Sequence, residues 1–227
     1  MKTTWLGQAG LLFETNGKII IVDPYLSNSV AKIQPQNYRR VPVDERFLEI
    51  KPDVIIITHN HADHLDKETL CHYLDENSEV TVLAPNGAWQ EVRKFGGGKN
   101  NYVIFNNGTT WTEGNVVFQA VKAEHSDEYA IGVIVFAEGE RYYFTGDTLY
   151  SENVFNSLPK EDIYAVFLPV NGKGNNMNST DAKRFAKRIN AKYVVPIHIG
   201  MFDDVTIDAF EDEFNVCPEI YKEIILE

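Results

Sequence analysis

Residues 54–66 decide the fold of this chain, and they read Val54-Ile55-Ile56-Ile57-Thr58-His59-Asn60-His61-Ala62-Asp63-His64-Leu65-Asp66. The stretch opens on a run of apolar, mostly β-branched residues, which is typical of a strand buried on both faces. It ends in three histidines and an aspartate within six residues, although the whole chain has only 6 histidines. A solvated loop has no reason to concentrate imidazole in this way, so the pattern indicates a metal site.

The direction of the side chains in this stretch predicts how its ligands divide. If residues 58–63 continue extended, His59, His61 and Asp63 point to one side. His64 leaves this alternation where the chain turns toward a helix, for which Asp66 is the expected N-cap. One short loop can therefore supply ligands to two neighbouring metal ions.

Length and composition place the chain among globular proteins. Its 227 residues, 44% hydrophobic and 24% charged, predict a single domain over residues 1–227. A net charge of −12 disfavours nucleic acids and anionic membranes as partners, and no apolar stretch approaches the roughly 20 residues of a membrane span. The expected partner is a small-molecule substrate, and the sequence permits a homo-oligomer.

Cysteine usage and the N-terminus predict a cytoplasmic protein. Cys71 and Cys217 lie far apart and outside any C-x-x-C pattern, which suits a reducing compartment. Residues 1–7 lack the apolar core of a signal peptide.

The order of apolar runs predicts an α/β protein with two sheets packed face to face and helices outside. Strands are expected over residues 2–6, 10–15, 18–23, 53–58, 79–84, 101–105, 115–123, 129–137, 140–145, 163–170 and 193–197. Helices are expected over residues 44–50, from Asp66, over 86–95, near 149–157 and over 179–190, with acidic helical patterns at the end of the chain. Residues 24–43 and 171–178 read as loops over the site.

Three further candidate ligands directly follow predicted strands. These residues are His125, Asp147 and His198. Ligand sites in layered α/β proteins gather at the edge where strands stop, so we expect the three to meet the 59–64 motif there. Each also has a simpler reading: a surface loop histidine, a helix N-cap and a hydrogen-bonded core histidine, respectively. His72 lies inside a predicted helix without a partner and reads as structural.

With these residues in place, the chain resembles the metallo-β-lactamase-fold hydrolase superfamily over essentially its full length. His59-x-His61-x-Asp63-His64 matches the central motif of that superfamily, and His125, Asp147 and His198 follow in the expected order. The resemblance implies an αββα sandwich of two mixed β-sheets, with helices on the outer faces and a dinuclear metal site.

The resemblance also assigns the ligands. His59, His61 and His125 would hold one ion; Asp63, His64 and His198 would hold the other; Asp147 would bridge the two. Asp23 matches the first acidic position of the family, which orients the site, although a simple Asp-Pro turn is the alternative reading.

Within the superfamily, three segments look most like the branch that contains L-ascorbate-6-phosphate lactonase. They are residues 5–10, 23–27 and 196–198. Class B β-lactamases are disfavoured, because they place a cysteine in the second metal site and are exported.

The expected enzyme is a dinuclear metal-dependent hydrolase that opens a small lactone or ester, a phosphorylated sugar lactone among them. Zinc suits the five imidazoles and two carboxylates best, with manganese or iron as alternatives. A hydroxide that bridges two divalent ions is the expected nucleophile, and Asp63 or a metal-bound water is the candidate proton relay. Arg39, Arg40 and Lys173 lie on the expected overhanging loops and are candidate phosphate contacts, or else solvated surface residues.

Two other functions compete with this one. The first is a phosphodiesterase, including the N-acylphosphatidylethanolamine phospholipase type, although no amphipathic basic anchor is visible. The second is a non-catalytic metal-binding protein that has kept the fold, against which the complete ligand set argues.

Overall fold

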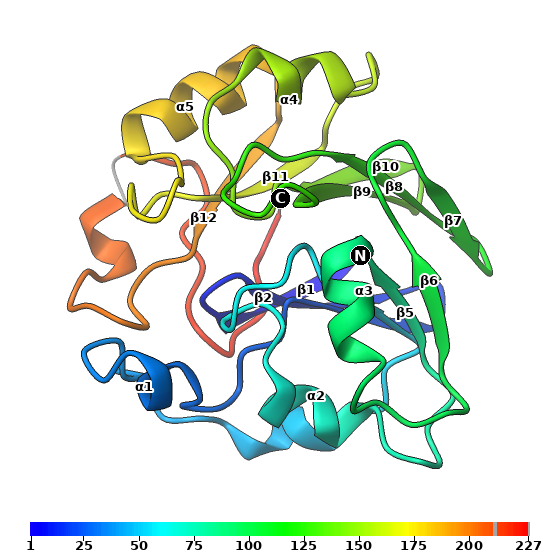
Figure 1. The fold of residues 1–227 in the computed structure, drawn as a ribbon. Helices are drawn as coiled ribbons and strands as arrows, with labels where there is room; N and C mark the ends of the chain where they lie inside the picture. The colour runs from blue at the N-terminus through cyan, green and yellow to red at the C-terminus, as the bar shows by residue number, and fades with distance from the viewer. Residues whose placement is uncertain (211–212, 227) are drawn as a thin grey trace.

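Two β-sheets stacked face to face, with helices on their outer faces, make up the protein (Figure 1). The computed structural model describes residues 1–210 and 213–226. The first sheet has the strand order β1 (Lys2–Gly7), β2 (Gly10–Thr15), β3 (Lys18–Val22), β4 (Val54–Ile56), β5 (Thr81–Ala84) and β6 (Asn101–Ile104). The second has the order β12 (Tyr193–Ile197), β11 (Ala165–Pro169), β10 (Glu140–Phe144), β9 (Ile131–Ala137), β8 (Val116–Lys122) and β7 (Thr110–Glu113). The predicted αββα sandwich is confirmed.

Both sheets are mixed, and their pairing brings many strand ends to one edge. Antiparallel pairing joins β1, β2 and β3, and parallel pairing continues from β3 through β6. In the second sheet β7 to β10 pair antiparallel, and β10, β11 and β12 pair parallel. Consequently β1, β3 and β4 end at the same edge of their sheet, and β8, β10, β11 and β12 end at the same edge of theirs.

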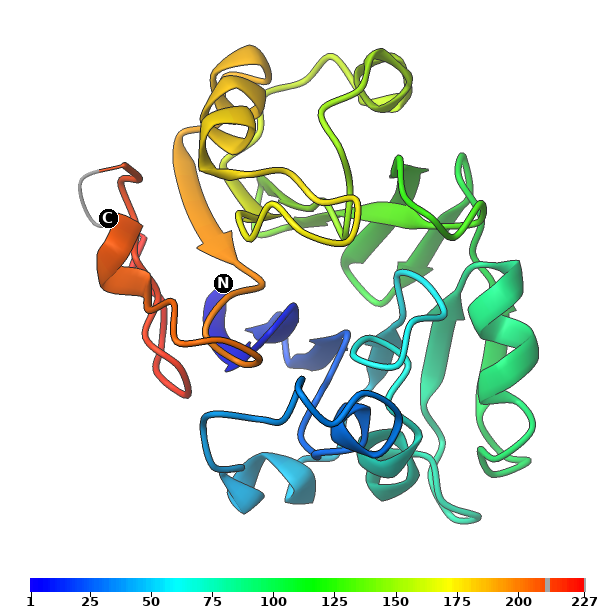
Figure 2. The ribbon, with the colours of Figure 1, turned by 60° about the vertical axis from the view of Figure 1, so that its left-hand side comes forward.

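The helices are short and lie outside the sandwich, as a second view also shows (Figure 2). They are α1 (Val30–Ile33), α2 (Lys67–Tyr73), α3 (Asn86–Val92), α4 (Glu152–Ser157) and α5 (Ser179–Arg188), with 3-10 turns at Glu45–Glu49 and Ile207–Phe210. Asp66 caps α2 as expected, because its carboxylate accepts hydrogen bonds from the backbone N–H groups of Glu68 and Thr69. None of the described helices combines the length and the hydropathy needed to span a bilayer.

Burial on two sides explains the apolar run that precedes the histidines. Val54 and Ile56 belong to the core between the sheets, whereas Ile55 and Ile57 pack into the core beneath α2 and α3. Since alternate residues of a strand point to opposite faces, only a continuous apolar run satisfies both cores. At the centre of the sandwich Phe13 packs edge-on against Phe144, with ring centroids 4.5 Å apart.

Two expectations about local structure are wrong. Residues 110–113 form the edge strand β7, which the polar run Thr110-Trp111-Thr112-Glu113 did not indicate. The acidic helical pattern at the end of the chain gives only the 3-10 turn 207–210 among the described residues, and part of it, residues 211–212, lies outside them. Further on, Ile220 and Glu223 form isolated β-bridges with the first strand instead. Tertiary pairing with an exposed strand edge overrides local helix propensity there.

Candidate metal centre

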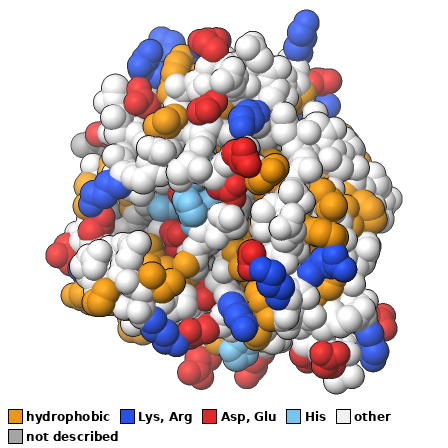
Figure 3. Space-filling view, viewed as in Figure 1, with side chains coloured by type: hydrophobic (Ala, Val, Ile, Leu, Met, Phe, Trp, Pro, Cys, Tyr) orange, Lys and Arg blue, Asp and Glu red, His pale blue; other side chains and the backbone are white. Residues whose placement is uncertain are grey.

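Four loops bring the candidate ligands to one place at the common edge of the two sheets. His59, His61, Asp63 and His64 follow β4, and His125 follows β8. Asp147 follows β10, and His198 follows β12 directly. In the space-filling view, histidine side chains line the floor of a hollow between the two layers (Figure 3). The strand-end pattern of the sequence therefore corresponds to one site.

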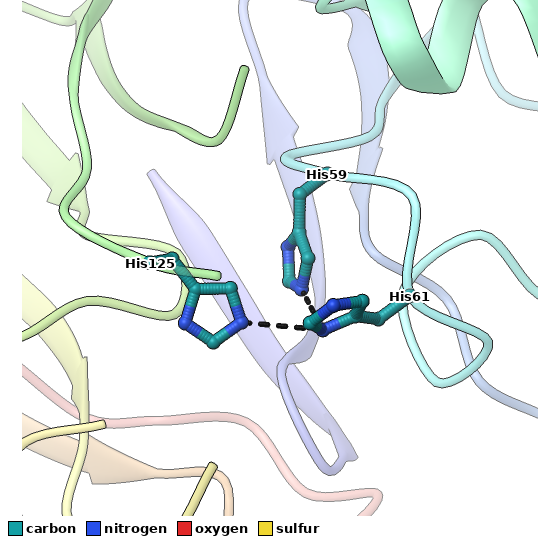
Figure 4. A group of neighbouring side chains, drawn as sticks. All are labelled: His59, His61 and His125. Carbon is teal, nitrogen blue, oxygen red and sulfur yellow. Dashed lines mark hydrogen bonds between the residues drawn. The ribbon is translucent and has the colours of Figure 1, made fainter. Parts of the chain in front are cut away.

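Three histidines form the first group. His59 and His61 come from the loop after β4, and His125 reaches them from the opposite sheet (Figure 4). The Nδ1 atom of His61 lies 3.0 Å from Nε2 of His59 and 3.2 Å from Nε2 of His125. The three nitrogens thus converge on a common centre.

The second group lies beside the first and contains a carboxylate. His64 Nε2 and His198 Nε2 are 3.3 Å apart, and Oδ2 of Asp63 lies 3.7 Å and 3.5 Å from them. Asp147 faces both groups: its Oδ1 is 3.1 Å from His198 Nε2, and its Oδ2 is 3.8 Å from His125 Nε2. Its position between the groups suits a bridging carboxylate.

The expected division of the β4 loop needs one correction. The strand ends at Ile56, and the backbone N–H groups of His64 and Leu65 both donate to the carbonyl of His61. This turn ends the alternation before Asp63, so Asp63 joins His64 in the second group and does not point with His59 and His61. One loop still supplies both groups.

Hydrogen bonds fix the ring orientation of three histidines. Nδ1 of His64 donates to Asp23 at 2.8 Å, Nδ1 of His59 faces the Thr58 hydroxyl at 3.1 Å, and Nδ1 of His125 faces the Asn175 carbonyl at 3.3 Å. Because each oxygen accepts from Nδ1–H, each ring is oriented with Nε2 toward the centre.

Asp23 orients the loop from below. Its Oδ1 accepts from the backbone N–H of Thr58 at 2.7 Å, and its Oδ2 accepts from the Thr58 hydroxyl and from His64. The residue has a φ of 42°, a left-handed conformation that aspartate tolerates better than most residues. A simple Asp-Pro turn does not account for these contacts, since they attach β3 to the candidate ligands.

The two groups differ in electrostatics. Burial, together with the nearby His64, lowers the pKa of His59 well below its ordinary value, and burial also lowers the pKa of His125. Burial alone would lower the pKa of His198 as well, but the carboxylates of Asp147 and Asp63 outweigh it and raise that pKa to about 9. Without a metal, His59 and His125 are therefore neutral, whereas His64 and His198 hold protons.

The histidines of the second group in turn lower the pKa values of these two carboxylates. Burial would raise the pKa of Asp147, but His198 and His64 hold it well below its usual range. Asp63 is shifted in the same direction, because His64 and His198 overcome its burial. Both carboxylates are thus available as anionic ligands near neutral pH.

Three amide side chains touch the candidate ligands, and the sequence patterns did not single them out. Gln8 Nε2 donates to Asp63 Oδ2 at 2.7 Å, Asn176 Nδ2 donates to Asp147 Oδ2 at 2.9 Å, and Asn171 Nδ2 lies 3.0 Å from His198 Nδ1. Gln8 directly follows β1, and Asn171 follows β11 after one residue, so the strand-end rule applied to polar residues of every kind would have found them.

A cavity of about 530 Å³ opens above the groups. The loops at 30–37, 171–176 and 199–203 form its walls, and its floor includes His61, Asp63, Asp147 and His198. The 171–178 loop was therefore placed correctly over the site.

Of the three basic side chains expected over the site, only that of Lys173 lies in the cavity lining. Lys173 lines the cavity, and its Nζ lies 3.3 Å from Oδ2 of Asp203. Arg39 and Arg40 are not among the described residues that line the cavity, and their role as substrate contacts stays a prediction. The guanidinium of Arg39 donates to the backbone carbonyls of Tyr25 and Val41 and to the Tyr221 hydroxyl, whereas Arg40 stacks on Tyr38 and pairs with Asp204.

The residues present fit a pair of divalent metal ions. Nε2 of His59 and Nε2 of His125 are both acceptors, because each ring uses Nδ1 as its donor, and a single Nδ1–H of His61 cannot satisfy both of them. Tetrahedral ligands around zinc lie about 3.3 Å apart, close to the 3.0–3.3 Å between the ring nitrogens here. Oδ1 of Asp147 is buried, and it lies 3.1 Å from Nε2 of His198 and 3.4 Å from Nε2 of His64, as expected for a carboxylate oxygen and ring nitrogens that share one cation.

The layered fold and this ligand set define a metal-dependent hydrolase of the metallo-β-lactamase type. Residues 2–198 match the family described as the Beta-lactamase superfamily domain. The chain belongs to that superfamily, and its curated relatives include UPF0173 metal-dependent hydrolases.

Individual relatives cover nearly the whole chain. It is 29% identical over 219 residues to the UPF0173 metal-dependent hydrolase of Geobacillus thermodenitrificans, with 92% of this chain and 89% of the relative covered. Identity to the Bacillus mycoides protein of the same name is 30% over 229 residues, with 93% and 90% covered. A solved metallo hydrolase from Ignicoccus hospitalis shares the fold, with a TM-score of 0.74, 20% identity, and 100% and 98% of the two chains covered.

Proposed function

We propose that this protein is a hydrolase that binds two divalent metal ions, zinc by preference, and opens a small lactone or ester. The observation that carries the proposal is the position of Asp147, whose two carboxylate oxygens face the two ligand groups. A carboxylate between two triads of ligand atoms suits a dinuclear centre better than two independent sites.

When bound as a pair, divalent ions lower the pKa of an intervening water and so supply hydroxide near neutral pH. The side chains of the protein arrange the reaction around it. Asn176 orients Asp147 by donating to its Oδ2, and Gln8 orients Asp63 by donating to its Oδ2. Asp63 lies in the cavity lining with 18% of its side chain exposed, so it is placed to pass a proton to the leaving group.

The cavity walls favour an uncharged substrate. Lys173 is the only lysine or arginine among the described residues that line the cavity, and Asp203 pairs with it. The other polar walls are mainly neutral amides, namely Gln8, Gln34, Asn37, Asn171, Asn175 and Asn176. A phosphate remote from the reacting bond would need fixed cations, whereas amides hydrogen-bond to hydroxyl and carbonyl groups. The likeness of three segments to the lactonase branch supports a lactone, and the walls favour its unphosphorylated form.

The test uses purified protein loaded with zinc, with the metal content measured by elemental analysis. We expect two equivalents of metal and hydrolysis of neutral lactones faster than of their phosphorylated counterparts, with phosphodiesters and β-lactams as further panels. Asp147→Ala should lower the rate by at least about 100-fold, because it removes a ligand common to both groups. Undiminished activity in this variant contradicts the proposal.

A further inference from the structure

Asn171 occupies a special position among the polar residues of the second group. Four histidines present Nε2 to the centre, and three of these have an oxygen opposite Nδ1. The fourth, His198, has the amide of Asn171 in that place, with Nδ2 of the asparagine 3.0 Å from Nδ1. His198 is 6% exposed, so water does not readily replace this contact.

The amide oxygen of Asn171 is unsatisfied as the side chain stands. Its Oδ1 is buried and has no hydrogen-bond partner among the described residues. A half-turn about the Cβ–Cγ bond exchanges Oδ1 and Nδ2, since the two ends of an amide have nearly the same shape. After this half-turn Oδ1 accepts from Nδ1–H of His198, and the buried oxygen gains its partner.

The half-turn also decides which nitrogen of His198 can bind a metal. With Nδ2 of Asn171 as donor, Nδ1 is the acceptor and Nε2 of the neutral ring carries the proton. With Oδ1 as acceptor, Nδ1 carries the proton, and Nε2 turns its lone pair toward Asp147 Oδ1 at 3.1 Å and His64 Nε2 at 3.3 Å. The second state matches the three other histidines.

Gln8 does not perform this role for His198. Its Nε2 lies 3.3 Å from both ring nitrogens, so it favours neither, and its shorter contact is the 2.7 Å hydrogen bond to Asp63. The carbonyl of Gln8 accepts from the backbone N–H of His198, which fixes the position of the backbone but leaves the tautomer open.

We propose that Asn171 is a positioning residue of the second metal site: its side-chain oxygen accepts the Nδ1 proton of His198 and so presents Nε2 as a ligand. This inference rests on the proposed two-ion centre. The equivalent partner of His64 is the carboxylate of Asp23, so a charged acceptor serves one histidine of the site and a neutral amide the other.

Metal titration of three variants tests the inference. Asn171→Ala removes the acceptor, and we expect the affinity for the second equivalent of zinc to fall by about 10–100-fold, while the first equivalent is unchanged. Asn171→Asp keeps an acceptor oxygen and should bind the second equivalent at least as tightly as the unmodified protein. Gln90→Ala, which removes an exposed amide on α3 outside the cavity lining, should bind both equivalents normally.

A nuclear magnetic resonance readout does not depend on activity or on the stability of the alanine variant. A long-range ¹H–¹⁵N spectrum of the zinc-loaded protein should show His198 protonated at Nδ1, both in the unmodified chain and in Asn171→Asp. Protonation at Nε2, wild-type binding of both equivalents by Asn171→Ala, or an alanine-like loss in Asn171→Asp overturns the inference. A single equivalent in the unmodified protein contradicts the two-ion centre instead, and the His198 tautomer then still tests Asn171.

Discussion

The carboxylate of Asp23 and the imidazole of His64 form a buried pair, with Oδ2 and Nδ1 2.8 Å apart. Neither residue is among those that line the cavity, and the contact leaves Nε2 of His64 for the second ligand group. Asp23 therefore affects the site by orienting the imidazole ring of His64, and not by contacting a substrate.

Replacement of Asp23 by asparagine tests the importance of this contact. Asparagine also tolerates the left-handed backbone of residue 23, so the fold should survive. We expect the second equivalent of metal to bind about 10–100-fold more weakly, because the amide is a poorer acceptor for His64 than the carboxylate. Metal titration measures this change, and Asp53→Asn, at the start of β4 away from the site, is the matched control. Equal binding in both variants contradicts the assigned role.

Loss of one ligand should remove one ion. In His61→Ala the first group keeps only His59 and His125, and we expect about one equivalent of metal and a rate reduced by at least about 100-fold. His72→Ala is the matched control, since this exposed histidine lies on α2 away from the candidate ligands. Elemental analysis after dialysis measures the stoichiometry, and two retained equivalents in His61→Ala contradict the assignment.

The sequence was sufficient to predict the fold and to select the histidines and aspartates that lie together at the candidate centre. Both signals are local: the run Val54–Ile57 reflects burial on two faces, and histidine is rare enough in this chain to stand out at three strand ends, with Asp147 at a fourth. Strand direction then brings His125, Asp147 and His198 to the same edge as the β4 loop without any further information.

Sequence patterns missed the amides of the site and did not show that the two arginines lie outside the cavity lining, and both have a common reason. Asparagine and arginine occur in most surface loops, so their role depends on tertiary contacts that no local pattern contains. Asn171 lies against His198 only because β11 and β12 are parallel neighbours. Arg39 turns away from the cavity because backbone carbonyls at Tyr25 and Val41 accept its donors.

The pH dependence of stability should differ between the metal-free and the metal-loaded protein. Burial opposes protonation of His198, but Asp147 and Asp63 raise its pKa from 6.5 to about 9. Because the folded pKa exceeds the unfolded value, this contribution to stability is complete below about pH 6.5 and disappears as the pH rises to about 9. The pKa of His64 is raised in the same direction by Asp147, Asp63 and Asp23.

We therefore expect the melting temperature of the metal-free protein to fall between about pH 6.5 and 9. The metal-loaded protein should lack this fall, because its ligand histidines are unprotonated throughout. Calorimetry of both forms measures the difference, and His198→Gln should reduce the fall in the metal-free form. Below pH 6.5 the lowered pKa values of His59 and His125 act in the opposite sense, so stability should also decline there. A metal-free melting temperature that rises from pH 6.5 to 9 contradicts this account.

Gly146 controls how Asp147 approaches the β4 loop. The residue has a φ of 60°, and a Cβ atom placed there would lie 2.6 Å from the Ile131 carbonyl oxygen and 3.2 Å from Cβ of Thr58. Gly146→Ala should cost more than about 2 kcal/mol of the free energy of unfolding, since backbone strain and overpacking add. Gly139→Ala is the matched control, because its φ is 83° but nothing lies within 4 Å, so it should show the backbone cost of about 1 kcal/mol alone. Urea unfolding of the metal-free proteins gives both values. Because the strain in Gly146→Ala falls next to Asp147, this variant should also bind metal more weakly, whereas Gly139→Ala should bind it normally. If both variants lose the same stability and both bind metal normally, close packing at residue 146 is contradicted.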